Sequence, residues 1–154
     1  MKPKGMTNLA AARAVIERVR GAGVTDFCVC GGSRNAPLIV ALAESRTFSF
    51  VDERSAAFFA LGRCRRDDKP VAVVTTSGTA VAELLPATVE AYYSGTPLVL
   101  ITADRPARFR GTGAPQTIEQ VGIFGSYAAT AIEKWSGRQP LHLNVEFDEP
   151  LIDE

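Results

Sequence analysis

Histidine and cysteine are scarce in this sequence: its 154 residues include one histidine and three cysteines. His142 lies in a strand-like apolar run at 141–145, so we expect a structural role for it and neither a Ser-His-Asp triad nor a histidine-rich metal site. Cys28 and Cys30 share one face of a strand-like run, and Cys64 lies in a helical pattern. An odd count without paired spacing favours neither a disulfide framework nor a zinc site. We expect three small buried hydrophobic groups and no metal ligands in this chain.

The sequence also has no excess of either charge and no long apolar run. Its 17 basic and 17 acidic residues cancel, so nothing indicates binding to nucleic acid or to an anionic membrane. No apolar run reaches the length of a membrane-spanning helix. After the basic N-terminus, Arg13, Glu17 and Arg18 interrupt the stretch in which a signal peptide needs apolar residues. We expect a cytoplasmic protein with one domain over 1–154 and no membrane span.

The hydrophobic pattern alternates between two periods along the chain. Apolar residues recur at three- and four-residue steps in some segments, whereas β-branched residues form short runs in others. The run at 71–75 is apolar on both faces, as a parallel strand covered by helices on each side requires. This alternation predicts an α/β fold with three α/β/α layers and a mainly parallel sheet. The expected helices are 7–20, 36–44, 53–66, 80–93 and 117–124, and the expected strands are 26–30, 47–51, 71–75, 98–102 and 141–145.

A polar loop follows each of the first four predicted strands, at 31–34, 52–54, 76–79 and 104–105. Because the carboxyl ends of parallel strands meet at one edge of a sheet, ligands bind outside that edge. Backbone amides, a carboxylate, hydroxyl groups and two guanidinium groups would line this rim. Neither a Gly-x-Gly-x-x-Gly turn nor a Walker A loop is present there, which argues against a classical NAD site or a P-loop.

Glu53 is the carboxylate at the centre of the rim. Asp52 is suited to be the N-cap of the helix 53–66, which places Glu53 in the first turn, near unpaired backbone N–H groups. In one interpretation Glu53 only complements the helix dipole, because acidic residues are ordinary in first turns. The convergence of the other polar loops favours a second interpretation, in which Glu53 serves a bound ligand.

Five motifs, in order, together resemble a single family. They are GSRNAPL at 32–38, DERSA at 52–56, TSGTA at 76–80, TADRP at 102–106 and GTGAPQTI at 111–118. This combination resembles the pyrimidine-binding domain of the thiamine-diphosphate enzyme of menaquinone synthesis, 2-succinyl-5-enolpyruvyl-6-hydroxy-3-cyclohexene-1-carboxylate synthase. The resemblance covers about 7–125 and resumes at 141–151. Each motif is weak alone, and the ordered set is specific.

The resemblance implies roles for residues on the rim. Glu53 matches the glutamate that hydrogen-bonds N1′ of the cofactor's aminopyrimidine ring and so promotes removal of the thiazolium C2 proton. The cofactor-binding positions that it implies are Gly31, Gly32, Glu53, Thr76, Ser77 and Gly78. The family's reaction decarboxylates 2-oxoglutarate and adds the product to isochorismate. The positions that it implies on the isochorismate side are Ser33, Arg34, Arg105 and Gln116. Arginine suits carboxylates because it donates two parallel hydrogen bonds.

Part of the family's site is missing from the sequence. The family holds the diphosphate and Mg²⁺ with a Gly-Asp-Gly motif and a downstream asparagine on a separate domain, and no Gly-Asp-Gly occurs here. The resemblance therefore implies a partner domain, in the same or another chain, and a homo-oligomer. Two departures stand out: Gly31 replaces the family's usual proline, and the segment 126–139 is shorter than the family's helical stretch at this place.

Several alternatives remain open at this point. The chain could be the pyrimidine domain of another thiamine-diphosphate enzyme, such as an acetolactate-synthase-like one, or a catalytically idle domain kept for assembly or regulation. Arg34 and Arg105 could each tie down a neighbouring loop carboxylate instead of binding substrate.

The aromatic pairs Phe58–Phe59 and Tyr92–Tyr93 suggest that the chain associates with itself. Adjacent residues on a helix point about 100° apart, so both members of a pair cannot face one core. We expect the helices that carry them to meet in a symmetric contact. The alternative is that the domain's own sheet and loops cover both pairs.

Overall fold

The computed structural model describes residues 5–152 and has a five-stranded sheet at its centre. The strand order is β2-β1-β3-β4-β5, and every neighbouring pair is parallel. The α/β fold class is thus confirmed. The strands are β1 (Asp26–Cys30), β2 (Arg46–Phe50), β3 (Val71–Thr75), β4 (Leu98–Asp104) and β5 (Leu141–Glu146). The predicted domain limits at 1 and 154 lie outside the described residues.

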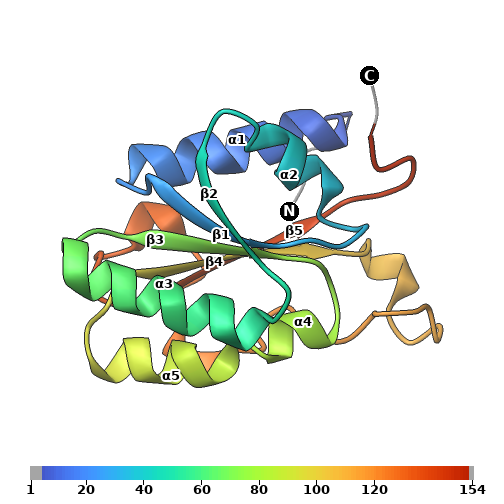
Figure 1. Cartoon of the computed structure of the whole chain (residues 1–154). Coiled ribbons are helices and arrows are strands. Elements are labelled where there is room, and N and C mark those ends of the chain that lie inside the picture. The colour runs from blue at the N-terminus through green and yellow to red at the C-terminus, as the bar shows by residue number, and fades with distance from the viewer. Residues whose placement is uncertain (1–4, 153–154) are drawn as a thin grey trace.

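Helices cover both faces of the sheet, as the apolar runs predict (Figure 1). On one face lie α1 (Asn8–Gly21) and α2 (Ala36–Ala41); on the other lie α3 (Glu53–Asp67), α4 (Thr79–Ala82) and α5 (Leu85–Tyr93). Alternate residues of the buried strands β3 and β4 supply the two cores. Val74 and Ile101 pack with α1 and α2, whereas Val73 and Leu100 pack with α3 and α5.

Side-chain caps fix where the two longest helices begin. Thr7 accepts a hydrogen bond from the backbone N–H of Ala10 at 3.1 Å and starts α1. Asp52 accepts one from the backbone N–H of Ser55 at 2.6 Å and starts α3. Hydrogen bonding with the side chain of Ser55, then with its backbone N–H, and the charge of Arg54 lower the pKa of the Asp52 carboxyl. Glu53 is therefore the first residue of α3, as the sequence predicts.

Three predicted helices differ from the observed ones. The helix expected at 80–93 is divided into α4 and α5, because Pro86 has no N–H to continue the ladder. The helix expected at 36–44 ends at Ala41, since the chain must turn before β2 begins at Arg46. The prediction of a helix at 117–124 is wrong: Gly122 has φ 75°, which a right-handed helix does not allow.

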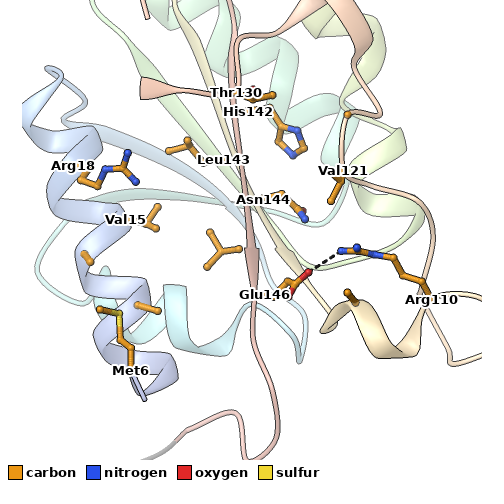
Figure 2. A pocket seen from close by; sticks show the side chains of 15 residues that line it. Met6, Val15, Arg18, Arg110, Val121, Thr130, His142, Leu143, Asn144 and Glu146 are labelled. Atoms are coloured by element: carbon orange, nitrogen blue, oxygen red, sulfur yellow. Dashed lines mark hydrogen bonds and ion pairs between the residues drawn. The ribbon is translucent and has the colours of Figure 1, made fainter. Parts of the chain in front are cut away.

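The segment before β5 runs beside the outer edge of that strand. It contains the 3₁₀ turns η2 (Gly125–Tyr127) and η3 (Ile132–Lys134), and Ala129 forms one parallel bridge with Leu141. A further 3₁₀ turn, η1 (Ala107–Phe109), follows β4. A cavity of about 770 Å³ lies along the β5 edge, where side chains of α1 face those of β5 across it (Figure 2).

The structural roles expected for the cysteines and the histidine are confirmed. The three thiols are free and buried, and burial raises the pKa of Cys28 and of Cys30 to about 12 and that of Cys64 to about 11. His142 is 3% exposed, with its Nε2 2.8 Å from the Thr102 hydroxyl. Burial lowers the pKa of His142 to about 4, so the ring is neutral at pH 7. Within residues 5–152, no helix is long and apolar enough to cross a membrane.

Candidate functional site

The loops that follow β1 and β3 are in direct contact at the carboxyl edge of the sheet. From β1 the chain proceeds to β2 on one side, and it later returns to β3 on the other, so the strand order reverses between β1 and β3. A methyl group on Gly32 would lie 2.6 Å from Cβ of Thr76, which is possible only for closely packed loops. Ligands of open parallel sheets bind at such a reversal. The structure thus brings together the predicted residues Gly31, Gly32 and Thr76.

Glu53 offers a free carboxylate beside these loops. It is partly exposed, and in the described part of the chain its side chain has no hydrogen-bond or ion-pair partner. The charge of Glu53 contributes to the raised pKa of Cys30, after burial of the thiol and ahead of the charge of Asp52. Glu53 therefore lies near the end of β1, as the rim requires. The N-terminus of α3 stabilises a negative charge at this position.

The turn Thr76-Ser77-Gly78 is buried, and the 116–120 segment packs against it. Gly78 has φ 82° and ψ −139°, a conformation open essentially to glycine alone. A methyl group there would lie 3.0 Å from Cα of Gln116. Gln116 is exposed and itself has φ 52°, which is uncommon for a residue with a side chain. The structure therefore brings two more predicted regions, 76–78 and Gln116, into contact.

Arg34 and Arg105 both reach Glu149, a carboxylate that sequence reasoning missed. Arg34 is 6% exposed; its Nη2 donates to Oε1 of Glu149 at 2.9 Å and its Nη1 to the carbonyl of Phe147 at 3.0 Å. Arg105 donates through Nε to the Pro115 carbonyl at 3.0 Å, with Nη1 3.8 Å from Glu149. Arg34 thus makes the loop contact that the structural alternative predicts. Arg105 keeps donors available, because its pairing with Glu149 is long.

Two further residues near the rim, Asp104 and Gln120, were not predicted as site residues, although the loop 104–105 was placed on the rim. Asp104 is fully buried at the end of β4 and pairs with Arg110 at 3.0 Å. Gln120 is fully buried and accepts a hydrogen bond from the Gly78 N–H. A glutamine in a glycine- and proline-rich stretch reads as a surface residue, so no sequence pattern indicated its burial. Ser33, in contrast, is exposed as the prediction requires.

The cavity along β5 is distinct from this site. It is lined by residues of α1, β5 and the 107–122 segment, and none of the predicted site residues is among them (Figure 2). Among residues 5–152, no group of three or more His, Cys, Asp or Glu side chains is arranged to hold a metal ion.

A protein-family model matches most of the chain. The family described as "Thiamine pyrophosphate enzyme, N-terminal TPP binding domain" matches residues 9–123. The chain belongs to this family. Thiamine pyrophosphate is another name for thiamine diphosphate, so the cofactor class implied by the motifs is confirmed at the level of the family.

Curated relatives of this TPP-binding domain carry one name. The chain is similar to the 2-succinyl-5-enolpyruvyl-6-hydroxy-3-cyclohexene-1-carboxylate synthases of Bdellovibrio bacteriovorus (51% identity over 96% of this chain), Akkermansia muciniphila (50% over 83%) and Geobacillus thermodenitrificans (42% over 96%). The resemblance stated from the five motifs is thus confirmed. The matched parts make up 31%, 27% and 30% of these relatives, so the chain spans less than a third of their length.

The Geobacillus relative is also longer within the matched region. The alignment extends over 177 positions, whereas the chain has 154 residues, so at least 23 positions (177 minus 154) have no counterpart here. This agrees with a shortened segment in the TPP-binding domain, which the motif comparison places at 126–139.

The residues on the rim fit one end of thiamine diphosphate. A flat aminopyrimidine ring needs a carboxyl group that can share a proton with a ring nitrogen, and a surface without bulky side chains. Among residues 5–152 the Glu53 carboxyl group has no partner, and at Gly32 and Gly78 the backbone itself forms the surface. These features suit the pyrimidine end of the cofactor.

Proposed function

We propose that this chain is the pyrimidine-binding part of a thiamine-diphosphate-dependent carboligase that combines 2-oxoglutarate with isochorismate in menaquinone synthesis. The observation that carries the proposal is the carboxylate of Glu53, which has no partner in the described part of the chain and is set on the first turn of α3 beside the β1 and β3 loops. The synthase name shared by relatives at 42–51% identity supports this choice of reaction. The cytoplasmic location expected from the sequence stays a prediction.

The residues of this chain bind and orient the pyrimidine end and move one proton. Thiamine diphosphate, when bound, supplies the carbon centre on which a 2-oxoacid is decarboxylated and its product transferred. Glu53 shares a proton with N1′ of the ring through its carboxylate, which stays in place because Asp52 caps the same helix turn. The buried turn 76–78 and Gly32 form the surface beside the ring.

Of the two arginines, Arg105 is the better candidate to bind a carboxylate of the substrate. Its guanidinium is about one-fifth exposed and has one short hydrogen bond, to a carbonyl group. The donors of Arg34 are buried and occupied by Phe147 and Glu149. We therefore assign Arg105, with exposed Ser33 and Gln116, to the isochorismate side, and we assign Arg34 to the support of that side.

The rest of the enzyme would be supplied by a diphosphate-binding domain, which holds the diphosphate and Mg²⁺. The chain's share of its relatives' length, less than a third, supports this division. Two pairs of exposed aromatic side chains support association through α3 and α5: Phe58 is 44% exposed, Phe59 39%, Tyr92 37% and Tyr93 76%. The domain itself covers both pairs only in part, because Phe59 packs on Phe48 and Phe50 and Tyr92 packs on Tyr127. A homo-oligomer remains our proposal.

Reconstitution tests the proposed function. The chain is combined with the diphosphate-binding domain encoded with it and assayed with thiamine diphosphate, Mg²⁺, 2-oxoglutarate and isochorismate. We expect product to form with this substrate pair and not with two molecules of pyruvate, the pair that an acetolactate-synthase-like enzyme uses. Turnover of pyruvate alone would favour that enzyme instead. Cofactor binding without turnover of either pair would favour an idle assembly domain.

A further inference from the structure

The side chain of Gln120 connects three parts of the protein at the rim. Its Oε1 accepts a hydrogen bond from the N–H of Gly78 at 2.8 Å. Its Nε2 donates to the carbonyl of Ala103, near the end of β4, at 3.0 Å, and to Oδ1 of Asn144 on β5 at 2.8 Å. The residue is fully buried. One amide therefore satisfies a backbone donor of the 76–78 turn and two acceptors on the last two strands.

The orientation of this amide is fixed by its partners. The Gly78 N–H can only donate and the Ala103 carbonyl can only accept, so exchanging the amide oxygen and nitrogen of Gln120 would break both bonds. Asn144 is fixed in turn, since its Nδ2 donates to the carboxylate of Asp104 at 2.8 Å. Every member of this chain of bonds depends on its neighbour. A change in one is expected to reach the Gly78 turn.

The titratable groups around Gln120 are already committed to partners. Neutral His142 donates from Nε2 to the Thr102 hydroxyl, which donates to Oδ1 of Asn144 at 2.8 Å. The Asp104 carboxylate accepts from Arg110 at 3.0 Å, and Arg110 also pairs with Glu146 at 2.8 Å. A negative charge introduced at Gln120 would thus meet an acceptor at Ala103, an acceptor at Asn144 and the Asp104 carboxylate beyond it.

Among the described residues, Gln120 is the one hydrogen-bond partner of the Gly78 N–H, whereas the Gly78 carbonyl accepts a hydrogen bond from the Val81 N–H at 3.0 Å. The residue precedes α4 with φ 82°, and α4 lacks a side-chain cap. The Gly78 N–H is buried, so without Gln120 it would be an unpaired donor or the turn would shift to reach water. Gln116 packs directly on Gly78, so such a shift would also displace the exposed side chain of Gln116. The positions of the Gly78 turn and of the Gln116 side chain thus depend on the side-chain amide of Gln120.

We propose that Gln120 is a positioning residue of the thiamine-diphosphate site, which holds the 76–78 turn and the Gln116 loop in the arrangement that binds the pyrimidine end. The inference rests on the proposed function and deepens it. Gln120 acts through Gly78 and has no contact with substrate of its own, because it is fully buried. It determines how well the turn fits the cofactor.

The test compares two variants of Gln120 that should weaken the hydrogen bond to Gly78 in different ways, one depending on pH and one not. Gln120→Glu keeps the acceptor for Gly78 but places an oxygen against Ala103 and Asn144, so its carboxyl must be protonated to fit and its pKa is raised. Gln120→Met fills a similar volume and offers no partner to Gly78 at any pH. Thr88→Val is the control: it removes a buried 2.8 Å bond to Leu84 within α5, away from the rim.

Amide hydrogen exchange of Gly78 is measured in this chain by nuclear magnetic resonance at pH 5.5 and pH 8.0, each variant against wild type at the same pH. We expect Gln120→Glu to exchange about tenfold faster at pH 8.0, a loss of the size expected for one buried hydrogen bond, and to approach wild type at pH 5.5. Gln120→Met should exchange faster at both pH values, and Thr88→Val should match wild type. Unchanged exchange in Gln120→Met would overturn the anchoring of Gly78.

The half-saturating thiamine diphosphate concentration of the reconstituted enzyme is measured on the same variants. We expect it to rise about tenfold in Gln120→Glu at pH 8.0 and to fall towards wild type at pH 5.5, in parallel with the exchange data. If the half-saturating concentration stayed within twofold of wild type in both variants despite faster Gly78 exchange, the proposal would be overturned, because Gln120 would then stabilise the fold without affecting cofactor binding. Wild-type enzyme that binds no cofactor would instead overturn the proposed function, a failure recognisable because the exchange data do not depend on it. If Gln120→Glu does not fold, Gln120→Met carries the same comparison.

Discussion

Replacing Arg34 by methionine tests the role that the structure gives this residue. The change keeps most of the side chain's volume and removes two hydrogen bonds, to the buried Phe147 carbonyl at 3.0 Å and to Glu149 at 2.9 Å. Loss of the charged donor to Phe147 costs about 1.5–3 kcal/mol. The Glu149 side chain is 69% exposed and can be hydrated, so its part is at most about 1 kcal/mol. We expect the free energy of unfolding to fall by about 2–4 kcal/mol.

Thermal melting of the chain, followed by circular dichroism, measures this loss. For a chain of this size each kcal/mol shifts Tm by roughly 2–4 °C, so Arg34→Met should melt about 4–16 °C lower. Glu149→Gln is the matched control, because it removes the charge and leaves the Phe147 bond; its Tm should fall by no more than about 2–3 °C. An Arg34→Met chain that melts within about 2 °C of wild type would refute the reasoning and return Arg34 to the substrate side.

Three other expectations follow from the structure. Calorimetry with Mg²⁺ should give the isolated chain a thiamine diphosphate Kd near or above about 1 mM; micromolar binding would mean that the chain itself holds the diphosphate. Light scattering over a range of concentrations should show self-association that Phe58→Ser with Tyr93→Ser weakens; a wild-type monomer throughout would contradict it. Because the pKa of His142 is lowered to about 4, the stability that its burial confers is complete above pH 6.5 and is lost as pH falls towards 4. Between pH 7.5 and 4.5, urea unfolding of wild type should therefore lose about 2–3 kcal/mol more than unfolding of His142→Leu, and equal losses would contradict the assignment.

The parts of the fold that local chemistry determines could be predicted from the sequence. Asp52 followed by an alanine-rich pattern predicted the start of α3, and the β-branched run of β3 predicted a strand buried on both faces. The meeting of the polar loops at one rim followed from the parallel sheet alone. The division of α4 from α5 was also available, since Pro86 cannot continue a helix.

The parts determined by long-range contacts could not be predicted. The stretch 117–124 has helical spacing, but it is held as an irregular loop by Gln120, whose partners lie at Gly78, Ala103 and Asn144. The resemblance implied a substrate role for Arg34, and its partner Glu149 could not be foreseen because it lies 115 residues away in the sequence. In both cases a polar side chain finds partners that only the folded chain brings near.

Glu53 carries the central claim, and its replacement by glutamine tests that claim most directly. In the reconstituted enzyme, the rate of product formation from 2-oxoglutarate and isochorismate is compared between wild type and Glu53→Gln, with thermal melting of both chains as the control. Since Glu53 is partly exposed and has no partner among the described residues, Tm should change little. The rate should fall by at least about 10²-fold, the scale expected for loss of acid–base assistance. A Glu53→Gln enzyme with near-normal turnover would contradict the assignment of this rim as the pyrimidine site.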